Sequence, residues 1–352
     1  MSLRCADDPQ ETAMTTVLLT GASGYIGKHI ALQLLEAGYI VRASVRSQVK
    51  ADEVVAALAP HLSDPTVANR VSFVHLDLTS DDGWTTALEG VDVLLHTASP
   101  FSVDKVKDES ILIRPAVDGT LRALRAARAA GVTRVVVTSS NAAIQGAVVP
   151  AGPVTYDESF WTDVTSPIGR DPYTKSKTLA ERAAWDFVAT EAPEINLTTI
   201  NPGLVIGPPL DRHYATSVEV IERVLAAKDP AMPDLSFPLV DVRDVAAMHV
   251  RCIDRPVTFG QRYLAAAGTY SFVDIARTLK AAFPTRKLVT RQAPNFLIHV
   301  LGLFDGQIKS IIPLLSKKMS FNAAKATRDL NIVFIDPATS LVETATFLLN
   351  EK

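Results

Sequence analysis

Short apolar stretches alternate with longer amphipathic ones over the first 200 residues of the chain. Residues 17–20, Val-Leu-Leu-Thr, have the apolar and β-branched character of a buried strand. Residues 28–37 then carry apolar side chains at helical spacing and stop before Gly38, a residue that favours a helix C-terminus. Residues 39–45 form the next apolar run, so the pattern predicts a strand, a turn, a helix and a second strand.

The same alternation continues to residue 200. Further strands are predicted at 71–76, 91–96, 133–138 and 195–200, and helices at 49–59, 83–89, 109–130 and 173–191. Strands that alternate with helices form parallel sheets with right-handed crossovers. The predicted fold class is therefore α/β, with a Rossmann-type doubly wound parallel sheet and a smaller C-terminal substrate-binding domain.

The pattern changes after Asn201, where prolines become frequent and the strand–helix repeat ends. We expect residues 1–13 to be a disordered N-terminal extension and residues 14–200 to form the nucleotide-binding domain. Residues 201–352 are expected to form mainly the substrate-binding domain. Segments near 240–265, including a strand at 262–264, are expected to return to the first domain.

Composition narrows the class of protein. The 352 residues are 47% hydrophobic, enough for a large core, and the net charge of −3 comes from scattered charges of both signs, which argues against nucleic-acid binding. Two cysteines, Cys5 and Cys252, make a structural disulfide improbable and fit the cytoplasm. We expect no secretory signal and no membrane span, because the most apolar stretch, residues 296–315, is interrupted by Asp305 and Lys309.

Candidate chemistry begins at the first turn, Thr20-Gly21-Ala22-Ser23-Gly24-Tyr25-Ile26-Gly27. Glycines at this spacing allow a tight turn, close approach of the backbone to a pyrophosphate, and close packing of helix on strand. The helix that follows offers unpaired N–H groups and a positive dipole end to the phosphates. The turn therefore predicts a dinucleotide site.

The end of the second predicted strand indicates which dinucleotide binds. NAD-binding folds usually place a carboxylate there for the ribose 2′-hydroxyl, whereas this chain has Arg46, with Lys50 beyond it. A guanidinium pairs well with a 2′-phosphate, so the predicted cofactor is NADP(H). Asp77 ends the third strand, where it either faces the adenine or caps the turn before Thr79 and Ser80.

A proton donor is predicted in the helix at 173–191. Tyr173 and Lys177 are four residues apart, so both project from one face, and the lysine ammonium is expected to lower the pKa of the phenol. Ser139 and Ser140 follow the strand at 133–138, at the sheet edge where such folds bind ligands. One of the two serines is expected to hold a substrate oxygen and the other to cap backbone groups.

These residues resemble a family, the extended short-chain dehydrogenase/reductases. The resemblance is greatest to its dihydroflavonol reductase, cinnamoyl-CoA reductase and methylglyoxal or aldehyde reductase group. It runs from about residue 15 to the C-terminus through TGASGYIG at 20–27, VRASVR at 41–46, HTASP at 96–100, VVVTSSNAA at 135–143, DPYTKSK at 171–177, NPGLVIGP at 201–208 and DVRDVA at 241–246.

The resemblance implies roles for individual residues. The catalytic residues it implies are Ser140, Tyr173 and Lys177, with Lys177 also binding the nicotinamide ribose. The expected cofactor-binding residues are Gly21, Ser23, Gly24, Tyr25, Ile26, Gly27, Arg46, Lys50, Asp77, Leu78, Thr97, Ala98, Ser99, Tyr173, Lys177, Pro202, Leu204, Val205 and Ser217. The expected substrate-binding residues are Ser99, Phe101 and Gln145, and no metal is expected.

The implied activity is NADPH-dependent reduction of aldehyde or ketone carbonyls to alcohols, by an enzyme that acts as a monomer or homodimer on a small-molecule substrate. Three alternatives stay open on the same fold: a nucleotide-sugar epimerase or dehydratase, a 3β-hydroxysteroid dehydrogenase-like enzyme, and a non-catalytic NADP(H)-sensing protein. Residues 209–235 and 285–320 match no substrate-specific signature, so the sequence does not name the substrate.

Overall fold

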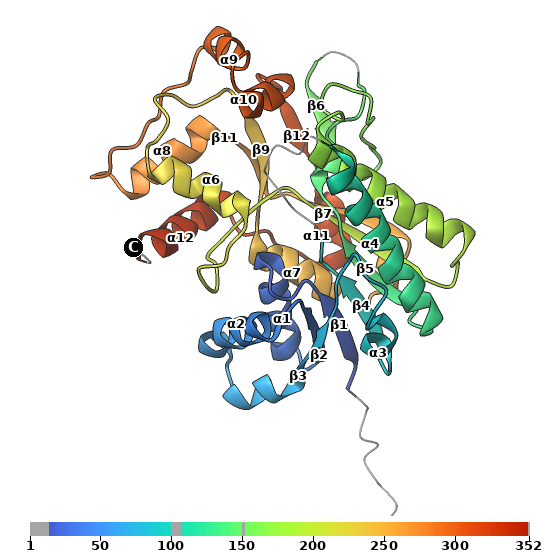
Figure 1. The fold of residues 1–352 in the computed structure, drawn as a ribbon. Coiled ribbons are helices and arrows are strands. Elements are labelled where there is room, and N and C mark those ends of the chain that lie inside the picture. Colours follow the sequence, from blue (N-terminus) through green and yellow to red (C-terminus); the bar gives the residue numbers. More distant parts are fainter. Residues whose placement is uncertain (1–13, 100–107, 150–151, 351–352) are drawn as a thin grey trace, which may run out of the picture.

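Seven parallel strands form the central sheet of the molecule, in the order β10-β7-β5-β4-β1-β2-β3 (Figure 1). The computed structural model describes residues 14–99, 108–149 and 152–350. The strands of this sheet are β1 (Thr16–Thr20), β2 (Ile40–Val45), β3 (Val71–His75), β4 (Val93–His96), β5 (Arg134–Thr138), β7 (Asn196–Pro202) and β10 (Gln261–Ala265). The order reverses between β1 and β4, as in doubly wound nucleotide-binding folds, so the predicted fold class is confirmed.

Helices cover both faces of this sheet (Figure 1). Along β1, Val17 and Leu19 pack into one buried cluster and Leu18 into the other, as the two-residue period of a strand requires. The first face carries α1 (Tyr25–Glu36), α2 (Gln48–Leu58), α7 (Val242–Arg251) and α11 (Ala324–Leu330). The second face carries α3 (Trp84–Leu88), α4 (Ser110–Ala129) and α5 (Pro172–Thr190).

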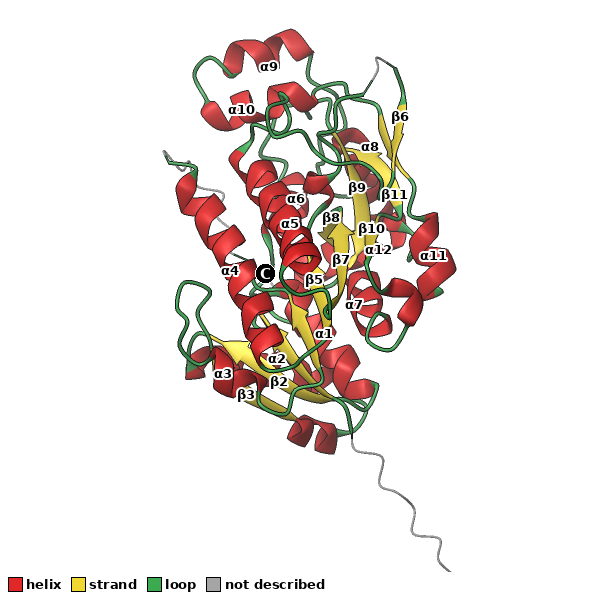
Figure 2. Ribbon diagram, turned by 90° about the vertical axis from the view of Figure 1, so that its right-hand side faces the viewer, coloured by secondary structure: helices red, strands yellow, loops and turns green. Residues whose placement is uncertain are grey.

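The C-terminal half builds a smaller unit beside the carboxyl ends of the strands (Figure 2). It contains a three-stranded sheet of β8 (Leu204–Ile206), β9 (Ser236–Asp241) and β11 (Gly268–Ser271). It also contains β12 (Met319–Phe321), which pairs in parallel with β6 (Val154–Tyr156), a strand that precedes α5 in the chain. Its helices are α6 (Thr216–Leu225), α8 (Phe272–Ala282), α9 (Asn295–Leu301), α10 (Gly306–Ile311) and α12 (Pro337–Asn350). The chain returns to the main sheet at β10, which pairs with β7.

The start of α5 is fixed by local chemistry. The Asp171 carboxylate accepts the backbone N–H of Thr174 at 2.9 Å, and Pro172 occupies the first helical position, where its missing N–H costs nothing. Tyr173 therefore lies in the first turn of the helix.

Two predictions about cysteines and membranes can be compared with this structure. Cys252 is a buried free thiol, whereas Cys5 lies outside the described residues. Within the described part of the chain, none of the helices combines the length and the apolar character needed to span a bilayer.

Candidate active site

The glycine turn leaves no room for side chains. Gly21 has a positive φ of +71°, and a Cβ on it would lie 2.8 Å from the backbone nitrogen of Ala98. A Cβ on Gly27 would lie 2.2 Å from the carbonyl oxygen of Gly21, where the turn folds back on the helix. The N–H of Gly24 donates to the same oxygen at 3.0 Å. The backbone therefore forms the bare, tight turn that a pyrophosphate site needs.

The N-terminus of α1 is suited to bind an anion. Gly24 is its N-cap, no side chain caps it, and its first turn has no acidic residue. The Tyr25 phenol points elsewhere, because it is buried and donates to the carbonyl oxygen of Gly207 at 2.7 Å. Burial raises the pKa of this phenol well above its usual value. The side chain of Tyr25 thus supports the turn by linking it to Gly207.

The residues beyond β2 fit a 2′-phosphate. Arg46 is exposed directly after the strand, and the strand ends without a carboxylate. Lys50 lies one turn into α2 and pairs with Glu53 at 2.6 Å. Asp77 accepts the N–H of Thr79 at 2.7 Å and its hydroxyl at 2.6 Å, and these bonds hold the pKa of Asp77 below its usual value. The turn-capping interpretation of Asp77 is therefore the one that its contacts support.

The segment after β4 is fixed beside the glycine turn. The Thr20 hydroxyl accepts the N–H groups of Thr97 and Ala98 at 3.1 and 3.2 Å, and the Thr97 hydroxyl donates to the Thr20 carbonyl at 2.6 Å. Ser99, two residues later, accepts a hydrogen bond from Lys177 Nζ at 2.8 Å. The segment after β4 therefore links the glycine turn, through Thr20, to Lys177 on α5. Phe101 lies outside the described residues.

The two adjacent serines have different partners. Ser139 Oγ donates to Glu181 Oε2 at 2.6 Å and is turned into the protein. Ser140 caps the short 3₁₀ turn Asn141–Ala143, where its Oγ accepts the N–H of Ala142 at 3.2 Å. A hydrogen bond with Ser140 also lowers the pKa of Tyr173, so Ser140 is the serine beside the tyrosine.

Tyr173 and Lys177 lie on one face of α5, as their spacing predicts. The Lys177 ammonium lies 5.8 Å from the centre of the Tyr173 ring. Burial lowers the pKa of Lys177 to about 8, which leaves the amine mostly charged at neutral pH. The net pKa of Tyr173 is raised, which is opposite to the lowering expected from the lysine, because burial raises it most, Asp171 raises it too, and only the hydrogen bond with Ser140 lowers it.

A residue that the sequence reasoning missed lies behind these groups. Glu181 is one turn beyond Lys177 on α5, and its buried carboxylate contacts Ser139, Asn201 and Arg262. The sequence did contain a signal for Glu181: it follows Tyr173 and Lys177 at the same four-residue spacing, so all three residues share one helix face.

Other expected site residues lie on β7, β8 and α6 and in the segments that follow β3 and β5. Pro202 and Val205 are buried at the end of β7 and in β8, while Leu204 is partly exposed between them. Ser217 is partly exposed in the first turn of α6. Gln145 Oε1 accepts a hydrogen bond from Asn141 Nδ2 at 2.8 Å. Leu78 is partly buried against Gly119, where an added Cβ would lie 3.1 Å from the Leu78 Cβ.

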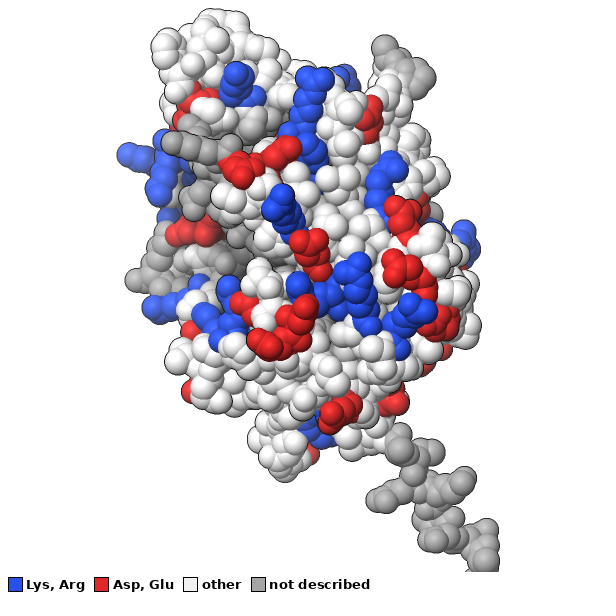
Figure 3. All heavy atoms as spheres, turned by 45° about the vertical axis from the view of Figure 1, so that its right-hand side comes forward, with Lys and Arg blue, Asp and Glu red and all other residues white. Residues whose placement is uncertain are grey.

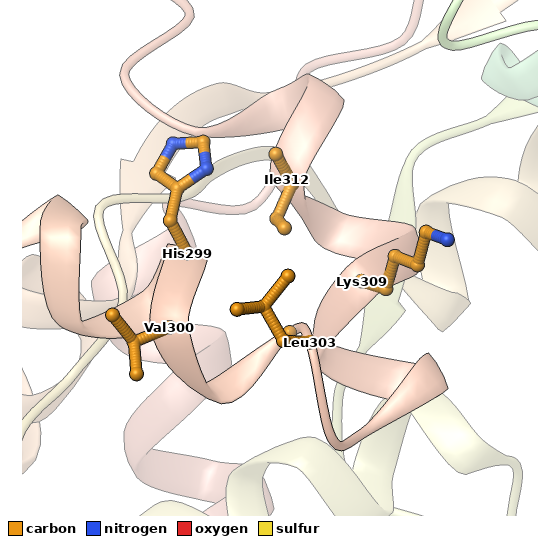
Figure 4. Close-up of a pocket in the computed structure, with 6 residues that line it drawn as sticks. His299, Val300, Leu303, Lys309 and Ile312 are labelled. Atoms are coloured by element: carbon orange, nitrogen blue, oxygen red, sulfur yellow. The ribbon is translucent and has the colours of Figure 1, made fainter.

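Two surface hollows lie away from this constellation, in the C-terminal half. One of about 300 Å³ lies between α9 and α10 and is lined by His299, Val300, Gly302, Leu303, Lys309 and Ile312 (Figure 4). The other, of about 580 Å³, lies where residues 227–230 meet residues 288–291. Neither includes an expected catalytic residue. The described residues contain no cluster of three or more metal-ligating side chains.

Comparison with known proteins finds one matching family model and relatives that are reductases. Residues 17–266 match the model of the NAD dependent epimerase/dehydratase family. The chain is 33% identical over 350 residues to the ketoreductase azaE of Aspergillus niger, covering 94% of this chain and 98% of the relative. It is 34% identical over 283 residues to a cinnamoyl-CoA reductase of Medicago truncatula, covering 79% and 84%. The crystal structure of yeast methylglyoxal/isovaleraldehyde reductase complexed with NADPH superposes with a TM-score of 0.78, at 25% identity, over 96% of this chain and 99% of that one.

Proposed function

The chain belongs to the NAD dependent epimerase/dehydratase family, and within it we propose that this enzyme reduces aldehyde and ketone carbonyls to alcohols with NADPH. Its relatives include a ketoreductase and NADPH-dependent methylglyoxal reductases. The observation that carries the proposal is the grouping of Ser140, Tyr173 and Lys177 at the carboxyl ends of β4 and β5. This is the edge where doubly wound sheets bind their ligands.

The cofactor would be held by residues that fit it. The glycine turn and the uncapped N-terminus of α1 suit the pyrophosphate. Arg46 suits the 2′-phosphate, which it can grip through a charge-assisted fork. Lys177, which is bonded to Ser99, would bind a hydroxyl of the nicotinamide ribose. When bound, NADPH supplies the hydride.

The side chains of the site handle the proton. Ser140 Oγ donates a hydrogen bond to the carbonyl oxygen and orients it towards Tyr173. As the carbonyl carbon gains the hydride, the Tyr173 phenol transfers its proton to the oxygen, which yields the alcohol and a phenolate. The Lys177 ammonium stabilises that phenolate. The raised pKa of Tyr173 keeps the phenol protonated before the reaction, as an acid requires.

The test is consumption of NADPH, with NADH in parallel, by the purified protein against aldehydes, α-dicarbonyls, β-ketoesters and dihydroflavonols. We expect turnover with a strong preference for NADPH, because Arg46 stands where NAD-binding folds place a carboxylate. No turnover with any carbonyl, together with release of tightly held NAD on denaturation, would instead identify a nucleotide-sugar epimerase or dehydratase.

A further inference from the structure

The Glu181 carboxylate is the centre of a buried polar network. Its side chain has no exposed surface. Oε2 accepts hydrogen bonds from Ser139 Oγ at 2.6 Å, Asn201 Nδ2 at 2.6 Å and Arg262 Nη2 at 3.4 Å. Oε1 accepts from Arg262 Nε at 2.7 Å, Thr199 Oγ1 at 2.9 Å and Trp185 Nε1 at 3.3 Å. Six hydrogen bonds from five residues therefore satisfy this carboxylate inside the protein.

The network connects one helix to three strands. Glu181 belongs to α5, Thr199 and Asn201 to β7, Arg262 to β10, and Ser139 follows directly after β5. A carboxylate bonded to all of them fixes α5 along its axis relative to the sheet. Hydrogen bonds to a buried ion are short and strong, so this attachment is stiff.

The same bonds reach the proposed reacting groups. Asn201 Nδ2 donates both to Glu181 Oε2 and to the backbone carbonyl oxygen of Ser140, the latter at 3.1 Å. Ser139 is the chain neighbour of Ser140 and is bonded to Glu181 as well. On the helix side, Tyr173 precedes Glu181 by two helical turns on the same face. Glu181 is thus connected to Ser140 through Ser139 and Asn201, and to Tyr173 through the helix α5.

Arg262 is anchored independently of Glu181. Its Nη1 donates to the carbonyl oxygens of Glu158 and Phe160, both at 2.7 Å. Its guanidinium carbon lies 3.7 Å from the centre of the Trp161 ring, a stacking distance. The cation therefore has a fixed place, and it neutralises the charge that Glu181 brings into the interior.

We propose that Glu181, paired with Arg262, is the positioning residue that sets the distance between the Tyr173 phenol and the Ser140 hydroxyl during carbonyl reduction. The proposal rests on the function proposed above. In the proposed mechanism Glu181 contacts neither substrate nor cofactor. It acts through its bonds to Ser139 and Asn201 and by fixing the position of α5 along its axis. Small displacements of reacting groups reduce rates steeply: about 1 Å can cost 10²-fold.

The test compares Glu181→Asp with a matched control, Arg134→Lys. Aspartate keeps the buried charge for Arg262 but shortens the side chain by one methylene. Arg134 is a buried arginine near the opposite end of β5, where it donates to the carbonyl oxygens of Cys252 and Asn196 at 2.9 and 2.6 Å. Both variants lose buried hydrogen bonds of a charged group, but only Glu181→Asp loses bonds to residues next to the proposed catalytic residues.

For Glu181→Asp we expect kcat to fall about 10- to 100-fold. The dissociation constant of NADPH, measured by fluorescence, should change less than about threefold, because its proposed contacts are untouched. The deuterium isotope effect with NADPH labelled at the transferred hydrogen should rise as the chemical step becomes slower. Arg134→Lys should lower the melting temperature and leave kcat and the isotope effect at wild-type values.

Equal kcat losses in the two variants, or an unchanged isotope effect in Glu181→Asp, would overturn the proposal, because either outcome reduces Glu181 to a stability role. If Glu181→Asp does not fold, Ser139→Ala provides the measurement: it removes one donor to Glu181 and should lower kcat by about tenfold or less, again with a raised isotope effect. Failure of the wild-type enzyme to reduce any carbonyl with NADPH would contradict the proposed function instead.

Discussion

The carboxyl edge of the main sheet and the α9–α10 end of the molecule place their side chains in opposite ways. At the edge, Ser139 and Asn201 are polar and buried, and both donate hydrogen bonds to the buried carboxylate of Glu181. At the other end, Leu303 and Phe304 are apolar and 79% and 86% exposed. The top of Figure 3, where α9 and α10 lie, is accordingly mostly uncharged.

The difference shows where this chain enforces a unique geometry. A buried polar group that loses its partner costs about 1–3 kcal/mol, so each bond at the edge selects one arrangement of the side chains around it. An exposed apolar side chain makes few contacts and selects little. Substitutions at the edge should therefore alter rates strongly, and substitutions at the α9–α10 end should alter both rates and stability weakly.

The largest effect is expected from Tyr173→Phe. Removing the phenolic hydroxyl removes the proposed proton donor, which should lower kcat by about 10²–10⁴-fold. NADPH affinity, measured by fluorescence titration, should change little, because the ring and Lys177 remain. Near-normal turnover of this variant would show that another group supplies the proton.

A smaller effect is expected from Arg46→Ala. A charged hydrogen bond to the 2′-phosphate contributes about 1.5–3 kcal/mol, so KM for NADPH should rise by about 10- to 100-fold. KM for NADH should stay constant, because NADH lacks that phosphate. Arg128→Ala is the control, since Arg128 lies in the last turn of α4 and pairs with Glu194, outside the proposed cofactor site. An equal loss with both cofactors would contradict the role of Arg46.

The pH dependence sharpens the comparison further. Since burial lowers the pKa of Lys177 to about 8, kcat/KM should be constant below this pH and fall about tenfold per unit above it, as the ammonium is lost. Lys177→Arg stays charged and should lack this limb.

The same titration does not unfold the protein. Between about pH 8 and the ordinary lysine value of 10.5, the unfolded chain binds more protons at Lys177 than the native protein does. The free energy of unfolding from this group therefore rises with pH across that window. A fall in kcat/KM that tracks a fall in melting temperature would contradict the assignment to Lys177.

The smallest effects are expected at the apolar end. Leu303→Ser and Phe304→Ser should each change the free energy of unfolding, measured by urea denaturation, by less than about 0.5 kcal/mol. Leu34→Ala, at a fully buried position of α1, should cost about 2–5 kcal/mol under the same conditions. A loss above about 1 kcal/mol for either exposed residue would mean that it is covered in solution.

Local patterns predicted the strand–helix alternation and the glycine turn, because both depend on residues close together in the chain. The strand pattern left the roles of Ser139 and Ser140 open because both follow the same strand, and the family resemblance was what implied Ser140. In the structure Ser140 caps the 3₁₀ turn at Asn141–Ala143, whereas Ser139 bonds to Glu181. The direction of the Tyr173 pKa shift was missed because burial, which raises this pKa, cannot be seen from a spacing of four residues.

The pairing of Glu181 with Arg262 could not be predicted from local patterns. Arg262 is 81 residues away along the chain, and its pairing depends on β10 returning beside β7. The C-terminal elements were the least predictable for a similar reason, since short strands such as β8 and β12 are defined by distant neighbours. Nothing in their own sequence marks these pairings.

The position of β10 also has a consequence for how the enzyme is made. A ribosome releases the chain from its N-terminus, and six of the seven main strands have been synthesised by residue 202. Arg262, the counter-charge of Glu181, comes later and adds the edge strand of the sheet. A nascent chain can therefore assemble its nucleotide-binding strands early, whereas Glu181 has no counter-charge until Arg262 has been synthesised.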